Sequence, residues 1–223
     1  LEERLAAIGR RLVGAEALEI GARDGSLLAL LKAKGWDTVG IDPMQRYASW
    51  AKRHHGVEIR DGYFRAGAFA GQRFDLIVAF HLIEHIDAPM PFLAAVRGAC
   101  RNGALLYLET PNAACLQQRQ LISTHPILYS RGTLAQLLEH AGFRILAMTD
   151  RAPGGVMTFD QLAVLAELCE GPGPGDWESV DAFDSVREWV VRSLRENFPY
   201  APPGLQNRIF QSARRLFGEP GAT

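Results

Sequence analysis

The stretch that most constrains the fold is residues 16–43, EALEIGARDGSLLALLKAKGWDTVGIDP. It runs from a short apolar segment through a glycine turn into a helical pattern, and then into a second apolar segment. Short apolar runs that alternate with helical patterns indicate βα units and a mostly parallel sheet. The chain keeps this alternation to about residue 150, so the sequence predicts strands at 16–20, 37–41, 57–60, 74–79, 103–109 and 143–149, with helices at 2–12, 26–34, 45–54, 89–100 and 131–141.

The C-terminal part of the chain follows a different pattern. TFDQLAVLAELC, residues 158–169, is short and apolar, and periodicity alone does not separate a strand from a helix there. EGPGPGDWES then reads as a linker because Gly and Pro dominate its first half. Beyond it, residues 179–198 predict an amphipathic helix, and residues 206–223 predict a short basic helix followed by a tail. We therefore expect a domain over 1–170 and a linker with a helical extension over 171–223.

Composition excludes several classes of protein. The chain has 223 residues, 48% hydrophobic residues and a formal charge of −1, which does not indicate a disordered or wholesale nucleic-acid-binding chain. Its three cysteines have no C-x-x-C spacing, so we expect a reducing, cytoplasmic setting. With neither a signal peptide nor an apolar run of about 18 residues, a soluble protein is expected. The missing initiator Met suggests a processed product or one domain of a longer protein.

The first glycine turn carries the first candidate binding site. In an open parallel sheet a ligand lies beyond the carboxyl ends of the strands, and Gly21 and Gly25 follow the first of them. Asp42 ends the second strand, where an acid takes a ribose hydroxyl pair. Glu19 would repel a pyrophosphate but attract an ammonium and a sulfonium, and Arg23 stands where a dinucleotide fold wants glycine. S-adenosylmethionine fits both departures.

Four motifs in order, LEIGARDG, VGIDP, RFDLIVAFHLIEHIDAP and LYLETPN, resemble those of class I S-adenosylmethionine-dependent methyltransferases. The resemblance is greatest to the branch of ubiquinone-type O-methyltransferases and sugar C-methyltransferases, and it spans roughly residues 15–150. It implies an α/β, Rossmann-like, seven-stranded, mostly parallel sheet with helices on both faces and an antiparallel last strand. For that reason we expect a strand within residues 158–169, and the C-terminal helical extension lies outside the shared pattern.

The same resemblance implies which residues bind the cofactor. The acid before the first glycine turn and the residues of that turn would surround the methionine part of the cofactor. The acid at the end of the second strand would bind the ribose hydroxyls. Residues after the second and third strands would contact the adenine. Two residues leaving the fourth strand would line the cofactor. In chain order these are Glu19, Gly21, Ala22 and Gly25, then Asp42, then Met44, Asp61 and Gly62, and finally Phe80 and His81.

Three of these positions have a structural alternative. Gly25 can be a glycine needed only for helix packing, Asp61 can be a solvated turn acid, and Phe80 can belong to the core. The shape of the first loop stays open because of Arg23.

The candidate catalytic residues are His81, His85 and His125. A base is needed only where the acceptor loses a proton. His125 lies in the loop after the fifth strand, where the resembled family places acceptor-facing groups, and His81 would point into the same crevice. His85 can instead be a histidine that fixes its loop. With Glu84 these histidines resemble the metal site of small-RNA terminal 2′-O-methyltransferases, but LIEH also occurs in metal-free relatives, so we expect no divalent metal.

We therefore expect methyl transfer from S-adenosylmethionine, with S-adenosylhomocysteine as product, to oxygen, nitrogen or carbon of a small molecule such as a sugar or an aromatic compound. A nucleic-acid substrate and a membrane partner are not expected, whereas a homodimer or a further domain fits the C-terminal segment. Two rivals stay open: a nicotinamide-dependent oxidoreductase and a non-catalytic scaffold that only binds the cofactor.

Overall fold

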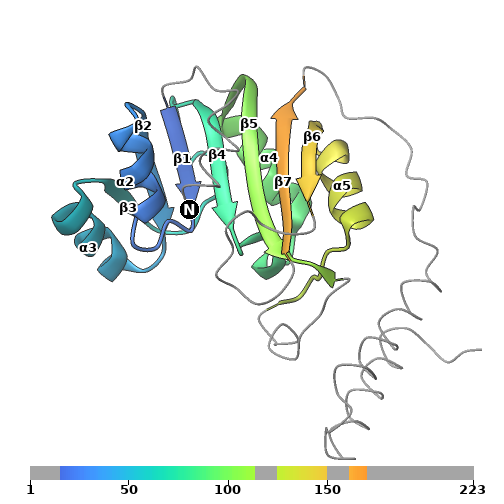
Figure 1. The fold of residues 1–223 in the computed structure, drawn as a ribbon, viewed down its shortest axis with the longest axis horizontal. Helices are drawn as coiled ribbons and strands as arrows, with labels where there is room; N and C mark the ends of the chain where they lie inside the picture. Colours follow the sequence, from blue (N-terminus) through green and yellow to red (C-terminus); the bar gives the residue numbers. More distant parts are fainter. Residues whose placement is uncertain (1–15, 114–124, 150–160, 170–223) are drawn as a thin grey trace, which may run out of the picture.

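The computed structural model describes residues 16–113, 125–149 and 161–169, and these build one seven-stranded sheet (Figure 1). The strands lie in the order β3-β2-β1-β4-β5-β7-β6. Their bounds are β1 (Glu16–Ile20), β2 (Asp37–Asp42), β3 (Glu58–Asp61), β4 (Phe74–Phe80), β5 (Cys100–Pro111), β6 (Phe143–Thr149) and β7 (Gln161–Leu168).

The direction of the strands agrees with the expected topology. β1 pairs in parallel with β2 and β4, and β4 pairs in parallel with β5, whereas β7 pairs antiparallel with both β5 and β6. The expected strand within 158–169 is therefore confirmed as β7. β5 is longer than the expected 103–109, because the chain already forms extended structure when α4 ends at Ala99.

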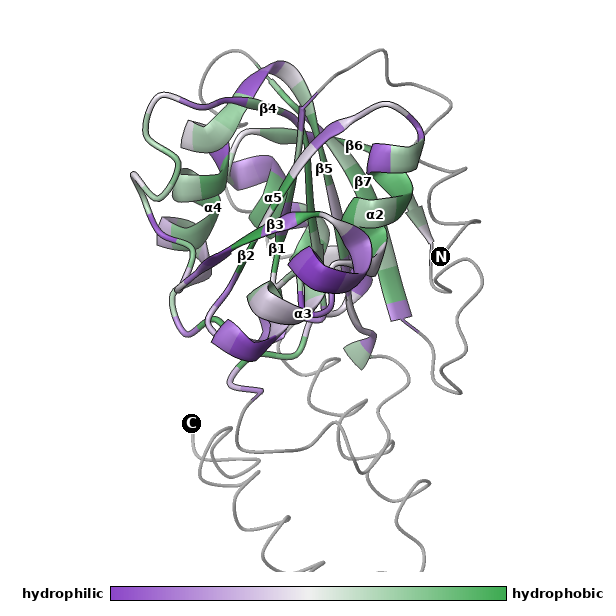
Figure 2. Cartoon of the chain, turned by 90° about the vertical axis from the view of Figure 1, so that its left-hand side faces the viewer, coloured by the Kyte–Doolittle hydropathy of each residue, from purple (hydrophilic) through white to green (hydrophobic). Residues whose placement is uncertain are grey.

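Two layers of helix cover the sheet because successive strand residues point to opposite faces. In β4, Leu76 and Val78 pack with α2 (Ser26–Ala33), whereas Ile77 and Ala79 pack with α4 (Pro89–Ala99) and α5 (Arg131–His140). α3 (Gln45–His55) joins α2 on the first face through a small cluster with β3. The strands carry mostly hydrophobic residues and α3 mostly hydrophilic ones (Figure 2).

Helix α5 begins where the sequence placed its N-cap. The Ser130 hydroxyl accepts a hydrogen bond from the backbone N–H of Thr133 at 3.2 Å, and the Thr133 hydroxyl accepts one from the Ser130 N–H at 2.9 Å. This reciprocal cap satisfies two N–H groups that the first turn of a helix leaves unpaired. It fixes the start of α5 directly after the segment that carries His125.

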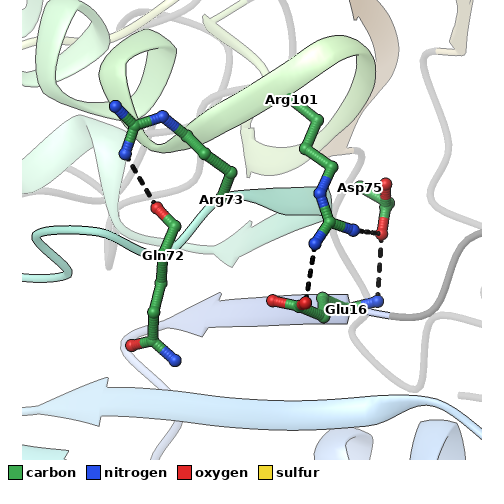
Figure 3. Close-up of polar contacts among 5 residues, drawn as sticks. All are labelled: Glu16, Gln72, Arg73, Asp75 and Arg101. Carbon is green, nitrogen blue, oxygen red and sulfur yellow. Dashed lines mark hydrogen bonds and ion pairs between the residues drawn. The ribbon is translucent and has the colours of Figure 1, made fainter.

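The amino edge of the sheet, where β1 and β4 begin, carries a group of paired charges (Figure 3). Arg101, at the start of β5, donates to Glu16 at 2.6 Å and also to the carboxylate of Asp75. The Glu16 backbone N–H donates to the same Asp75 carboxylate at 3.1 Å. One guanidinium thus joins three neighbouring strands at this edge.

Two expected elements lie outside the described residues: the helix at 2–12 and the extension at 171–223. Within the described ranges, none of the helices is long and apolar enough to cross a membrane.

Candidate cofactor and acceptor site

The candidate site lies at the carboxyl edge of the sheet, where the strand order reverses between β1 and β4. A chain that leaves β1 turns towards β2 there, while the chain that leaves β4 turns the other way, and ligands bind in the crevice between such loops. The backbone N–H of Gly21 donates to the Ile41 carbonyl at 2.8 Å, which ties the first turn to β2.

The first loop contains three residues in the left-handed region, Gly21 at φ 77°, Arg23 at φ 44° and Gly25 at φ 72°. Arg23 therefore takes the conformation for which a dinucleotide fold uses glycine, at the cost of some backbone strain. Its N–H donates to Asp42 Oδ2 at 3.0 Å, and this bond helps to hold the loop. The loop shape that the sequence left open is thus set by a contact with β2.

Asp42 is nearly buried, with 5% of its surface exposed. Its Oδ1 accepts a hydrogen bond from the Met44 N–H at 2.8 Å, while Oδ2 accepts the one from Arg23. A carboxylate has about four lone-pair sites, so both oxygens can still accept hydroxyl donors. Asp42 consequently joins the loops after β1 and β2 and keeps acceptor capacity.

Glu19 is the other buried acid at this edge, with 6% exposure. Its Oε2 is buried and has no hydrogen-bond partner among the residues that the structure describes. Burial, followed by the charges of Asp24 and Asp42, raises the pKa of Glu19 well above its ordinary value. An uncompensated buried carboxylate between two other acids is costly, and a bound cation would relieve that cost.

The glycines of this region have different roles. Among the described residues, a Cβ on Gly21 would meet only Leu82 Cδ1, at 3.9 Å, so those residues leave space beside the first turn. A Cβ on Gly25 would lie 2.9 Å from Val57 Cγ2, which shows the packing role that the sequence offered as an alternative. Gly40 was missed by sequence reasoning: a Cβ there would lie 2.5 Å from the Ala22 Cβ. A glycine inside a strand signals such a close approach.

The remaining expected cofactor residues lie around the same edge. Asp61 pairs in register with Asp42 and is exposed, and the Gly62 N–H donates to the Asp42 carbonyl at 3.1 Å. Met44 is exposed at the start of α3. Phe80 is half-buried with its ring 5.9 Å from that of Tyr107, so it contributes to packing at the end of β4.

His81 follows β4 in a left-handed conformation, at φ 49°. Its N–H donates to the Glu109 carbonyl at 2.8 Å, and its Nδ1 lies 3.4 Å from Glu84 Oε1. Glu84 is 1% exposed, and its Oε2 accepts a hydrogen bond from the Thr110 hydroxyl at 3.0 Å. A strained residue beside a buried acid is typical of a functional site.

The structure also brings His85 and His125 together, although 40 positions separate them in the chain. Their ring centroids lie 4.6 Å apart in an edge-to-face arrangement. His85 is exposed and His125 is half-buried. A histidine that fixes its loop would be expected to be buried, whereas His85 faces solvent. Glu84, His85 and His125 each place one ligand atom within 4.8 Å of the others.

Sequence reasoning also missed two buried polar residues near these histidines. Glu109 is fully buried and accepts a hydrogen bond from the Tyr107 hydroxyl at 2.7 Å. Tyr129 is buried, and burial followed by the Glu84 charge raises its pKa to about 12. ETPN supplied the signal for Glu109, since an acid at the end of an apolar strand is unusual, whereas nothing in the sequence near Tyr129 marks it.

The comparisons with known proteins agree with this geometry. The family described as "Methyltransferase domain" matches residues 1–148, so the chain belongs to that family. The resemblance to class I S-adenosylmethionine-dependent methyltransferases is thereby confirmed, and the two rival functions find no support.

Curated relatives include a ubiquinone biosynthesis O-methyltransferase of Cereibacter sphaeroides, 30% identical over 104 residues, which are 44% of this chain and 42% of the relative. The same enzyme of Azorhizobium caulinodans is 35% identical over 108 residues, 46% and 43% of the two chains. The chain thus spans less than half the length of these relatives.

Solved structures share the fold. The glycopeptide N-methyltransferase MtfA complexed with S-adenosyl-L-methionine has a TM-score of 0.60 at 21% identity, over 75% of this chain and 92% of that one. A putative S-adenosylmethionine-dependent methyltransferase of Listeria monocytogenes has a TM-score of 0.60 at 15% identity, over 76% and 99%. At such identities the likeness concerns the fold.

Proposed function

We propose that this protein transfers a methyl group from S-adenosylmethionine to a small-molecule acceptor. The observation that carries the proposal is the pair of buried acids at the switch point: Glu19, whose Oε2 has no hydrogen-bond partner in the described part of the chain, and Asp42, which has spare acceptor capacity. S-adenosylmethionine offers a cationic methionine end and a ribose diol, and these two groups complement the two acids.

In this proposal Glu19 receives the cationic end of the cofactor and Asp42 its ribose hydroxyls. The open space beside Gly21 lets the methionine part approach the backbone, with Ala22 and Gly25 shaping the turn. Met44, Asp61 and Gly62 lie after β2 and β3, where the adenine would rest, and Phe80 and His81 close the site from β4. We assign these five residues to the adenine and to the rim of the site because each lies at or just after the end of β2, β3 or β4 at the carboxyl edge.

The chemistry asks little of the protein beyond alignment. The acceptor atom forms a bond to the methyl carbon as the carbon–sulfur bond breaks, and the sulfur keeps the electron pair as a neutral leaving group. Holding the two reactants in line supplies much of the rate enhancement. A hydroxyl or amine acceptor also gives up a proton, and we propose His81, whose Nδ1 lies 3.4 Å from Glu84 Oε1, as the group that receives it, with His85 and His125 as the other candidates.

The acceptor is proposed to be a small molecule methylated on oxygen, nitrogen or carbon, such as a sugar or an aromatic compound. The named relatives support O- and N-methylation, since they are a ubiquinone biosynthesis O-methyltransferase and a glycopeptide N-methyltransferase. We further propose residues 1–170 as the methyltransferase domain, with 171–223 as a helical extension. The free thiols of Cys100 and Cys169 support a cytoplasmic setting.

The test is calorimetric titration of the protein with S-adenosylhomocysteine and, separately, with NADH. Asp42→Ala is compared with Asp37→Ala, which removes an exposed acid from the other end of the same strand. We expect S-adenosylhomocysteine to bind wild type and Asp37→Ala alike and Asp42→Ala more weakly. A preference for NADH, or equal binding to both variants, would overturn the proposed site.

Turnover is tested by S-adenosylhomocysteine release from S-adenosylmethionine in the presence of catechols, sugars and small amines. S-adenosylhomocysteine release that depends on one of these acceptors would support methyltransferase activity. Cofactor binding with no release on any member of the panel would favour a scaffold.

A further inference from the structure

We propose that Glu84, His85 and His125 form a binding site for one divalent transition-metal ion, on the acceptor side of the proposed cofactor site. The three candidate ligand atoms lie within 4.8 Å of one another, close enough for all three to reach one ion with small side-chain adjustments. Sequence reasoning expected no metal, because the LIEH pattern also occurs in metal-free relatives. Folding brings His125 to the LIEH segment, and that is the new observation.

Two segments far apart in the chain are held together at this point by the backbone. Glu84 and His85 lie in the short helix η1 (Ile83–His85), which follows β4. His125 precedes Tyr129, whose carbonyl accepts a hydrogen bond from the Ala113 N–H at 2.8 Å. The extension of β5 therefore anchors the histidine segment beside η1. Such a framework positions ligands before an ion arrives.

The carboxylate of Glu84 is the most constrained of the three ligands. It is 1% exposed, and its Oε2 is oriented by the Thr110 hydroxyl at 3.0 Å. Its Oε1 has no hydrogen bond, and the nearest cationic candidate in the described part of the chain is His81 Nδ1 at 3.4 Å. A buried carboxylate with so little compensation is costly, whereas a metal ion on Oε1 would satisfy it. The Thr110 contact then acts as an outer partner that orients the ligand.

The two histidines determine the class of ion. Two imidazoles and one carboxylate suit a transition-metal ion such as Zn²⁺ or Co²⁺ rather than Mg²⁺ or Ca²⁺, which prefer all-oxygen sites. Because His85 is exposed and His125 half-buried, the site faces solvent on one side. Three protein ligands and an open side leave at least one position for a further oxygen.

That open position suggests the acceptor class, a conclusion that rests on the proposed function. Glu84 Oε1 lies 3.4 Å from Nδ1 of His81, one of the proposed cofactor residues, so an ion on Glu84 would lie beside the proposed cofactor site. A bound hydroxyl loses its proton more readily on such an ion. The site therefore fits an acceptor that is methylated on a hydroxyl oxygen, with that oxygen in the open position.

The first experiment titrates chelator-treated, full-length protein with Co²⁺ and follows the visible absorption, with Zn²⁺ as competitor. We expect one ion per chain. His85→Ala and His125→Ala should each weaken Co²⁺ binding at least about tenfold, and the double variant should abolish it. His140→Ala is the matched control, since His140 ends α5 at the opposite edge of the sheet. Co²⁺ that binds equally to wild type and to the double variant would overturn the site.

Two further measurements separate this inference from the proposed function. Glu84→Gln keeps an acceptor for Thr110, so we expect an unchanged melting temperature with at least about tenfold weaker Co²⁺ binding. S-adenosylhomocysteine is titrated into the same variants. Cofactor binding without Co²⁺ binding overturns the metal site alone, and Co²⁺ binding without cofactor binding overturns the proposed function alone. Methylation of a hydroxyl acceptor that is insensitive to chelator and to His85→Ala would overturn the acceptor class.

Discussion

The acidic residues at the two edges of the sheet differ in whether a cationic side chain lies beside them. At the amino edge, Glu16 and Asp75 share one arginine, Arg101, and each carboxylate lies beside a cation (Figure 3). At the carboxyl edge, Glu19 and Asp42 are buried and, within the described residues, neither forms an ion pair with a lysine or arginine. One strand, β1, therefore begins with a compensated acid and ends with an uncompensated one. The first edge supports the fold, and the second keeps charge available for a ligand.

The largest expected effect follows from Asp42→Ala. It removes a charged acceptor for the ribose hydroxyls, so S-adenosylhomocysteine affinity should fall about 10- to 150-fold. The N–H groups of Arg23 and Met44 also lose their acceptor, and the free energy of unfolding should fall by about 1–3 kcal/mol. Titration calorimetry and denaturant unfolding measure the two effects, with Asp37→Ala as control. Unchanged affinity would show that the carboxyl edge is not the ligand edge.

Gly25→Ala tests packing at the carboxyl edge. The new Cβ would lie 2.9 Å from Val57 Cγ2 and would occupy a left-handed backbone position at φ 72°. We expect the free energy of unfolding to fall by about 1–3 kcal/mol. Gly35→Ala is the matched control, because it has positive φ but nothing within 4 Å of its Cβ. Equal losses in the two variants would assign the effect to the backbone conformation alone.

Glu19→Gln and Glu16→Gln compare the two ends of β1 directly. Burial raises the pKa of Glu19, so the folded protein keeps its proton at pH values where the unfolded chain has released it. Stability of the free protein therefore falls as the pH rises from the ordinary carboxyl pKa to the raised one. Glu19→Gln should remove this fall, whereas Glu16→Gln should slightly lower stability.

Ligand affinity should respond in the opposite direction. Ionised Glu19 attracts the ammonium group, so S-adenosylhomocysteine affinity should rise with pH over the same interval and be about tenfold lower in Glu19→Gln above it. Thermal melts and titrations between pH 4 and 9 measure both trends. Parallel pH profiles for wild type and Glu19→Gln would contradict the prediction.

The smallest effect is expected from Arg101→Gln at the amino edge. Ion pairs at a partly exposed edge contribute little and are screened by salt, so the melting temperature should fall by less than about 4 °C and the difference should shrink in 1 M salt. Hydrogen bonding to Glu16, with support from Asp75, raises the pKa of Arg101, which therefore stays charged. Cofactor affinity should not change. Weaker S-adenosylhomocysteine binding in Arg101→Gln would contradict the conclusion that the amino edge supports the fold and only the carboxyl edge binds the ligand.

Much of the fold could be predicted because its signals are local. Alternating apolar runs gave six strands within a few residues of their observed bounds, and Ser130 correctly marked the start of α5. The β7 strand required the family resemblance, because a short apolar run has the same composition in a strand and in a buried helix. The start of β5 at Cys100 could not be predicted, since it depends on pairing with β4.

The features of the candidate site also fall into two groups, those with a local signal in the sequence and those that depend on contacts between distant segments. Glu19, Gly21 and Asp42 have a local signature, a charge or a glycine at the end of an apolar strand. The bond from Arg23 to Asp42 and the close approach of Gly40 to Ala22 have none, because each joins separate segments of the chain.

The sequence by itself determined the alternating α/β pattern, the family and the acids at the strand ends, since these depend on neighbouring residues. Only the tertiary structure decided that, among the described residues, Glu19 Oε2 has no partner while Glu16 pairs with Arg101, and that His125 lies against His85. The physical reason is that desolvation and ligand geometry depend on which distant segments pack together. A carboxylate at either end of β1 looks the same in the sequence until the sheet forms around it.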